Sequence, residues 1–316
     1  MSERDLASAN QVYIEAQAAL GPKPPLSAVE WWQAWLEIQH ERMWLNYWQN
    51  QPDKIEALVA RARPFVEQYG TPAQRAEFFH GQLLMELNRQ RWRVTDEMLD
   101  YLRAYVAAQR QVDNPGELAF AIFVEGFCWL WYGDLGQARE QLQSALTMAE
   151  RTGDISLQSR CLTYLTIVGR QCGQVEQTRQ CAARSLELAT AAHMPEYMAT
   201  ARANQAWVAW CTGDLSQVQE LGRAALALWH QMPTGQVTGV QWTALWPLIT
   251  VALHEEQHSL AIEHARTLLD PGQQRLPDEL VVNLEQAIQA WDGGAPEVAR
   301  VLLQQSVTLA EQLRYL

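Results

Sequence analysis

The sequence contains one run of residues with the spacing of a catalytic zinc site. His254 and His258 enclose Glu255 in the pattern HExxH, and His264 follows. In zinc peptidases, two histidines spaced in this way lie one turn apart on a helix, and the glutamate between them acts on a zinc-bound water. The run HExxHxxAxxH at 254–264 therefore favours a zinc metallohydrolase, with the three histidines as ligands.

This run resembles the zinc site of metzincin peptidases, but it departs from that site at two points. Ala261 stands where those enzymes have a glycine, and no methionine follows Met232 to form their Met-turn. A repeat in the chain also aligns residues 256–258 with a turn that begins at Gly213. We therefore expect the run to cross a bend between two helices, where the histidines cannot share one helical face.

The elements around this run are set by a repeat of helical hairpins. A turn with a leading glycine recurs at Gly133, Gly173 and Gly213, at intervals of 40 residues. Small residues precede and follow each turn at fixed distances, where two packed helices need a close approach. These residues are Gly126, Thr166 and Ala206 before the turns, and Ala145, Ser185 and Ala225 after them. A single hairpin cannot bury so wide an apolar face, so the pattern predicts stacked neighbours of the same design.

The small residues, the turn glycine and the Ala145-Leu146 pair resemble the tetratricopeptide repeat. The period of 40 residues exceeds the usual length of about 34, and Ile122, Leu162 or Arg202 stands where tryptophan is commonest. The long-period form is similar to the sensor regions of bacterial LuxR-type activators, signal-transduction ATPases and ATPases fused to nucleotide cyclases. The resemblance implies an all-α fold, a right-handed α-solenoid of about seven TPR-like helical hairpins.

We expect one repeat domain over residues 1–316. Residues 1–25 form a leading helix and a Pro-rich linker, and residues 26–316 hold the repeats, with Gly293 and Gly294 at the last turn. The final helix, 296–316, keeps an apolar stripe without a polar helix after it. It should therefore either pack back on the stack or be covered by another subunit.

Composition narrows the classes of function. The net charge is −12, with 24 Lys and Arg against 36 Asp and Glu, which speaks against direct binding of nucleic acid. The five cysteines form no CxxC pair and suit reduced thiols of a cytoplasmic protein. The longest apolar run, 118–131, is too short to cross a membrane. No GxxxxGKS/T, GxGxxG or GxSxG motif occurs, so neither a cofactor nor enzymatic activity is expected.

The better candidate site is the concave groove that the first helices of the hairpins line in the repeats this chain resembles. An aromatic floor flanked by two arginines suits an extended peptide with apolar side chains and a carboxylate, because arginine binds a carboxylate through two parallel hydrogen bonds. Counting from the turn glycines transfers the groove positions of those repeats to this chain. The predicted groove residues are Phe120, Phe123, Phe127, Trp131, Arg160, Thr163, Ile167, Arg170, Trp207, Trp210 and Trp246. The alternative is that many of these rings face the next hairpin.

The function predicted from sequence is a non-catalytic module that binds a peptide, a protein or a small molecule in this groove. It would be the sensor or scaffold part of a bacterial signalling or transcription regulator. A bound ligand would change how the repeats pack on an ATPase or output domain of the same or another chain. The alternatives are the zinc metallohydrolase and a structural module that assembles through its last helix.

Overall fold

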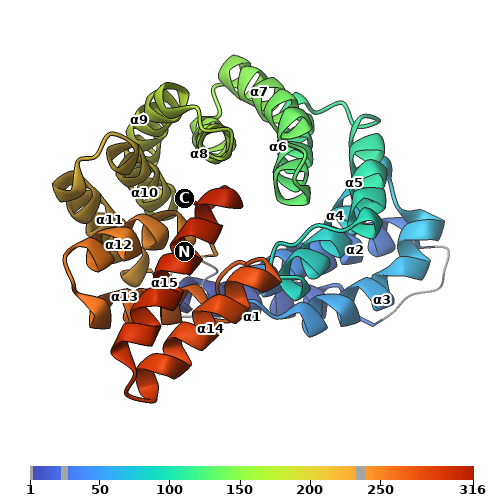
Figure 1. Ribbon diagram of the computed structural model, residues 1–316. Helices are drawn as coiled ribbons and strands as arrows, with labels where there is room; N and C mark the ends of the chain where they lie inside the picture. Colours follow the sequence, from blue (N-terminus) through green and yellow to red (C-terminus); the bar gives the residue numbers. More distant parts are fainter. Residues whose placement is uncertain (1–2, 23–27, 233–238) are drawn as a thin grey trace. The chain divides into compact units, whose positions relative to one another are not determined.

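The computed structural model describes residues 3–22, 28–232 and 239–316, and every regular element in these ranges is an α-helix (Figure 1). The helices are α1 (Glu3–Ala19), α2 (Val29–Trp48), α3 (Pro52–Tyr69), α4 (Pro72–Arg89), α5 (Asp96–Gln109), α6 (Pro115–Tyr132), α7 (Leu135–Thr152), α8 (Ile155–Gln171), α9 (Val175–Ala191), α10 (Pro195–Cys211), α11 (Leu215–His230), α12 (Trp242–His254), α13 (His258–Leu268), α14 (Asp278–Asp292) and α15 (Pro296–Gln312). After the leading helix α1, they follow one another as seven hairpins, from α2 with α3 to α14 with α15. The predicted all-α fold with about seven hairpins is confirmed.

The described residues form two compact units. The first extends to Met148, and the second contains Ala149–Met232 and residues 239–316, so the division falls within α7. The first unit therefore holds α1 to α6 with most of α7, and the second holds the end of α7 with α8 to α15. A single repeat domain stays a prediction, and the part of the predicted linker at 23–25 lies outside the described residues.

A Gly-Asp pair explains two of the sharp turns between paired helices. Gly133 has a φ of 102° and Gly213 a φ of 78°, both in the left-handed region that favours glycine. The backbone N–H of Asp134 donates to the Trp129 carbonyl at 3.0 Å, which closes the end of α6. The Asp134 carboxylate then accepts the N–H of Gln137 at 3.0 Å and caps α7, and the second turn repeats this arrangement. Two residues thus end one helix and start the next.

The turn between α4 and α5 forms without glycine. Arg91 and Trp92 have φ values of 49° and 61°, a conformation that costs a non-glycine residue roughly 1 kcal/mol. The Trp92 indole Nε1–H donates to the Tyr47 hydroxyl of α2 at 3.3 Å, so a contact outside the hairpin holds the turn. The turn of the second hairpin thus has a stabilising contact where the other hairpins have a turn glycine.

The small residue seven before the turn at Gly133 allows α6 and α7 to approach closely. A Cβ added to Gly126 of α6 would lie 2.7 Å from Leu142 Cγ and 2.8 Å from the Leu142 backbone nitrogen of α7. In the next hairpin, the close approach falls at Gly169 of α8, four residues before the turn glycine, where a Cβ would lie 2.9 Å from Thr178 Oγ1 of α9. At Gly126 the obstacle includes backbone, which cannot move aside as a flexible side chain can.

We expect Gly126→Ala to lower the free energy of unfolding by about 2 kcal/mol, because the overlap outweighs the better helix propensity of alanine. Gly136→Ala in α7 is the matched control, since a Cβ there would meet only the Asp134 Oδ1 atom at 3.4 Å. The control should be neutral or gain about 0.5 kcal/mol. Urea unfolding of both variants measures the difference, and equal stability of the two would refute the close approach.

Candidate binding site around Arg170

The HExxH run does not form a zinc site. Helix α12 ends at His254, Glu256 has a φ of 58°, and α13 begins at His258, so the run crosses the bend that the repeat register predicted. Within the described ranges, no three His, Cys, Asp or Glu side chains are placed to hold a metal ion. The histidines at 254, 258 and 264 therefore give no support to the metallohydrolase.

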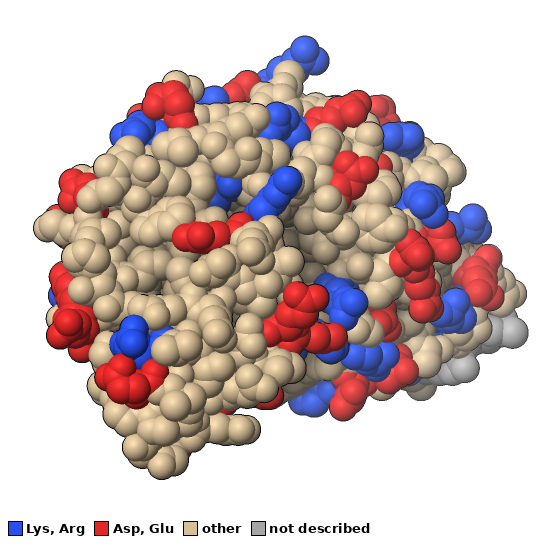
Figure 2. All heavy atoms as spheres, in the orientation of Figure 1, with Lys and Arg blue, Asp and Glu red and all other residues tan. Residues whose placement is uncertain are grey.

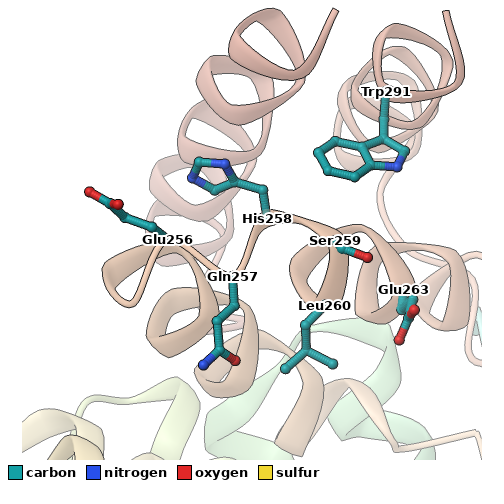
Figure 3. Close-up of a pocket in the computed structure, with 7 residues that line it drawn as sticks. All are labelled: Glu256, Gln257, His258, Ser259, Leu260, Glu263 and Trp291. Carbon is teal, nitrogen blue, oxygen red and sulfur yellow. The ribbon is translucent and has the colours of Figure 1, made fainter. Parts of the chain in front are cut away.

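A shallow depression lies beside this bend, within the second unit. Figure 3 shows its lining side chains, with the Glu256 and Glu263 carboxylates pointing in different directions and away from the His258 ring. The remaining lining residues are Gln257, Ser259, Leu260 and Trp291. The carboxylates are thus not arranged to act together on one bound group.

The predicted groove residues fall into two sets by their exposure. Six are buried: Phe123, Thr163, Ile167, Arg170, Trp207 and Trp246. Five are half-buried: Phe120, Phe127, Trp131, Arg160 and Trp210. The expected open position is wrong for the buried six, because neighbouring helices cover them; the Thr163 hydroxyl, for example, hydrogen bonds to the Ser185 hydroxyl of α9 at 2.8 Å. A role of the eleven residues in binding stays a prediction.

The four aromatic residues predicted on α6 form a continuous row in the first unit. Successive ring centroids from Phe120 through Phe123 and Phe127 to Trp131 are 5.8, 6.4 and 5.9 Å apart. The Phe120 ring also meets the His80 ring of α4, with centroids 5.8 Å apart. These distances are those of packed aromatic pairs, so the row contributes to the core of its unit.

Arg170 is the most unusual side chain of the predicted set. It lies near the end of α8 and is only 2% exposed. One terminal nitrogen donates to the Thr243 carbonyl of α12 at 2.7 Å and lies 3.5 Å from Asn204 Oδ1 of α10. The other donates to the Tyr315 carbonyl at 2.7 Å. A single guanidinium thus joins α8, α10, α12 and the residues that follow α15.

Two tryptophan rings contact this guanidinium. Its central carbon lies 5.6 Å from the Trp207 ring centroid and 5.0 Å from that of Trp242, so it makes cation–π contacts with both. Burial lowers the pKa of Arg170 to about 9, which still leaves the group charged at neutral pH. Among the residues that the structure describes, Arg170 forms no ion pair. The second unit therefore contains a buried cation whose partners are rings and neutral oxygens.

Such a guanidinium suits the binding of a carboxylate. Arginine presents parallel N–H groups that match the two oxygens of a carboxylate, and charged hydrogen bonds gain strength away from water. The Trp242 ring would form one wall of the site, since its centroid lies 5.0 Å from the guanidinium carbon and a hydrogen bond from its Nε1–H to Gln274 Oε1 at 2.9 Å fixes its position. We define the Arg170 site as Arg170, Asn204, Trp207, Trp242 and Thr243.

Three members of this site were missed from the sequence: Asn204, Trp242 and Thr243. Trp242 lies one helical turn before Trp246, which was in the predicted set, so helix periodicity could have found it. Thr243 contributes a backbone carbonyl, and side-chain chemistry gives no signal for such a contact. Tyr315, which contacts the site, is 145 residues from Arg170, beyond the reach of any local pattern.

A second cluster of ionisable residues lies in the first unit, around His40, Glu77 and His80. His40 Nδ1 is 3.7 Å from Glu77 Oε2, and the His80 ring stacks on the Tyr105 ring with centroids 4.8 Å apart. Burial lowers the pKa of His40 to about 4 and that of His80 to about 3. Burial, together with the neighbouring carboxylates of Glu37, Glu41 and Glu117, raises the pKa of Glu77 to about 7. The two histidines are therefore neutral at neutral pH.

Glu77 should make stability depend on pH. Its pKa rises from 4.5 when unfolded to about 7 when folded, so the folded chain binds more protons between these values. Stability is therefore lost as the pH rises through this window. We expect Glu77→Gln to be more stable than the unchanged protein at pH 8 by about 1 kcal/mol, a figure reduced because the side chain is 35% exposed. Thermal unfolding between pH 4.5 and 8 measures this gain, and a gain independent of pH would contradict the assignment.

Acidic and basic side chains are interspersed on the face of the molecule in view in Figure 2. None of the described helices is long and apolar enough to span a bilayer. Neither finding identifies a partner, and the expected absence of nucleic acid and membrane partners stays a prediction.

No family model matches the sequence, and no curated protein matches it. Solved structures do match. A Rap protein in complex with competence and sporulation factor aligns with a TM-score of 0.68 and 13% identity, covering 98% of this chain and 83% of that chain. The fold is that of tetratricopeptide-like helical-repeat proteins. This outcome confirms the TPR-like fold predicted from the turn and small residues.

Two further structures show the same likeness. NprR in complex with its cognate peptide NprX has a TM-score of 0.64 and 15% identity, covering 98% of this chain and 80% of that chain. The apo form of RapI has a TM-score of 0.59 and 12% identity, covering 98% of this chain and 82% of that chain. At such identities the likeness concerns the TPR-like fold alone, so the LuxR-type or ATPase context stays a prediction.

Proposed function

We propose that this chain is a non-catalytic, peptide-binding regulator, and that the Arg170 site is where the peptide binds. The observation that carries the proposal is the hydrogen bond from buried Arg170 to the backbone carbonyl of Tyr315. The site thus already holds a short stretch of polypeptide by its main chain. The TPR-like neighbours include a structure of NprR with its cognate peptide, which supports a peptide as the ligand class.

The chemistry of the site favours a peptide over other ligands. Trp207 and Trp242 provide aromatic surface, Arg170 provides donors for a carboxylate or carbonyl, and Asn204 adds a polar side chain. Aromatic and arginine side chains contribute most of the binding energy in many protein interfaces. A protein segment or a small carboxylic acid would use the same contacts, but a peptide matches the group already bound there.

As a regulator, the chain would change its interactions with other domains or proteins when the peptide binds. We place it in the cytoplasm, as the sensor or scaffold part of a signalling or transcription regulator whose ATPase or output domain belongs to the same or another chain. Ligand binding can shift the population of two packings only if the ligand binds one of them more tightly. The contacts of Arg170 with α10 and α12 offer such a difference, because a ligand on Arg170 would alter them.

Selection from a displayed library of random octapeptides tests this function on the intact protein. Enriched peptides should bind with a Kd on the order of micromolar, and Arg170→Met should weaken them roughly tenfold or more. Arg184→Ala is the control, since Arg184 pairs with Glu150 on the surface of the same unit. A library that yields no specific binder would contradict the peptide-binding function. Binders whose affinity is unaffected by Arg170→Met would show that the peptide does not bind at the Arg170 site.

A further inference from the structure

Residues 313–316 leave the end of α15 in a conformation that costs energy. Arg314 has a φ of 64°, in the left-handed region usually taken by glycine. Its N–H donates to the Glu311 carbonyl at 3.1 Å, and the Tyr315 N–H donates to the Ala310 carbonyl at 2.8 Å. These two bonds are the Schellman arrangement that ends many helices, here with arginine at the position that favours glycine. The chain thus adopts a sharp turn at a strained residue.

That turn brings the segment onto the Arg170 site of the second unit. The Tyr315 carbonyl accepts from Arg170 at 2.7 Å, and the Tyr315 ring meets the Trp242 ring with centroids 4.9 Å apart. Arg314 donates to the Gln171 carbonyl of α8 at 3.4 Å, and Leu316 is buried. Figure 1 shows the end of the chain beside α8 and α10. The segment 313–316, which we name the internal occupant, therefore packs back on the repeats.

The internal occupant satisfies Arg170 only in part. The Tyr315 carbonyl is a neutral acceptor, and a charged donor forms stronger bonds with a charged acceptor. The Nε atom of Arg170 is buried and makes no hydrogen bond with any of the described residues. A carboxylate has two oxygens and a full negative charge, so it could use donors that a single carbonyl leaves unused.

We propose that the internal occupant holds the place of the ligand, and that the ligand is a peptide whose carboxylate displaces the Tyr315 carbonyl from Arg170. The inference rests on the proposed peptide-binding function and adds the ligand's chemistry and the means of its control. An aromatic residue next to the carboxylate would take the place of the Tyr315 ring against Trp242. Binding then requires release of the internal occupant, which lowers the apparent affinity by the fraction of molecules in which the site is free.

Two substitutions in the intact chain should shift this competition in opposite directions. Tyr315→Pro removes the N–H that bonds to Ala310 and disfavours the turn at Arg314, so it should release the internal occupant. Arg314→Gly relieves the left-handed strain at a cost of only the long, exposed bond to the Gln171 carbonyl, so it should hold the internal occupant more firmly. The probe is the acetylated tripeptide Leu-Arg-Tyr, made with a free carboxylate or a carboxamide, and tryptophan fluorescence reports its binding.

We expect the carboxylate probe to bind Tyr315→Pro about tenfold more tightly than the unchanged protein, and Arg314→Gly roughly fivefold more weakly. The carboxamide probe should bind Tyr315→Pro about tenfold more weakly than the carboxylate. Tyr315→Ala, which removes only the ring, should give an intermediate gain and replaces Tyr315→Pro if circular dichroism shows that the proline variant is unfolded.

Equal affinity of the variants for the carboxylate probe would show that the internal occupant does not compete with the ligand. Peptides selected by the intact protein would still support the peptide-binding function in that case. Equal affinity for the two probes would show that the site does not recognise the carboxylate. No binding of either probe to a folded, released variant would overturn the whole inference, and the library selection would then decide the proposed function separately.

Discussion

Replacing Arg170 by alanine should lower the free energy of unfolding by about 3 kcal/mol. The side chain is 2% exposed, so its removal leaves a cavity among α8, α10 and α12. It also leaves the Thr243 and Tyr315 carbonyl oxygens without their donor, and an unsatisfied buried acceptor costs roughly 1–3 kcal/mol. Loss of a buried charge offsets part of this cost, which is why we expect no larger effect.

Arg170→Met separates volume from hydrogen bonding. Methionine fills much of the space and removes the charge, so this variant should lose only about 1 kcal/mol. The surface variant Arg184→Ala should lose less than about 0.5 kcal/mol, because its pair with Glu150 is solvent-exposed. Denaturant unfolding followed by circular dichroism measures all three. Arg170→Ala as stable as Arg184→Ala would show that the buried guanidinium does not hold these helices together.

Replacing Trp242 by alanine should have the largest effect of any single change at the site, a loss of about 4 kcal/mol. The indole is 1% exposed and contacts both the Arg170 guanidinium and the Tyr315 ring. Trp242→Phe keeps a ring but leaves Gln274 Oε1 without the indole donor, so it should lose about 1–2 kcal/mol. In thermal unfolding, the midpoint temperature should therefore be lowest for Trp242→Ala, higher for Trp242→Phe and highest for the unchanged protein.

Trp291→Ala is the matched control for Trp242→Ala in the same unit. Trp291 is half-buried beside the bend between α12 and α13, so its loss removes less buried area and leaves no deep cavity. We expect a loss of about 1 kcal/mol. Comparable losses for the two alanine variants would mean that Trp242 does not have the central packing position that its contacts indicate.

The hairpins could be predicted from the sequence because their signals are local. Gly133, Gly173 and Gly213 all have positive φ, and Gly126 lies against Leu142 where a side chain would collide. The same register placed the HExxH run across a bend, and α12 does end at His254. Each of these outcomes depends on residues within one hairpin, where spacing along the chain determines spacing in the structure.

The Arg170 site could be predicted only in part, because its contacts join distant residues. The positions of Arg170 and Trp207 relative to a turn glycine predict that both line the groove, with burial against the next hairpin as the alternative for the ring. Both are buried. An arginine among apolar helices needs water or a partner, and here the partners are the backbone carbonyls of Thr243 and Tyr315. Main-chain acceptors carry no residue-type signal. Of the two positions expected for the final helix, the structure shows packing back on the repeats.

A crystal structure of the intact chain with a peptide selected from the octapeptide library tests the Arg170 site most directly. We expect a peptide carboxylate within hydrogen-bond distance of Arg170, an aromatic side chain against Trp242, and residues 313–316 withdrawn from the site. A peptide bound elsewhere, with the Arg170–Tyr315 hydrogen bond still at 2.7 Å, would contradict this expectation.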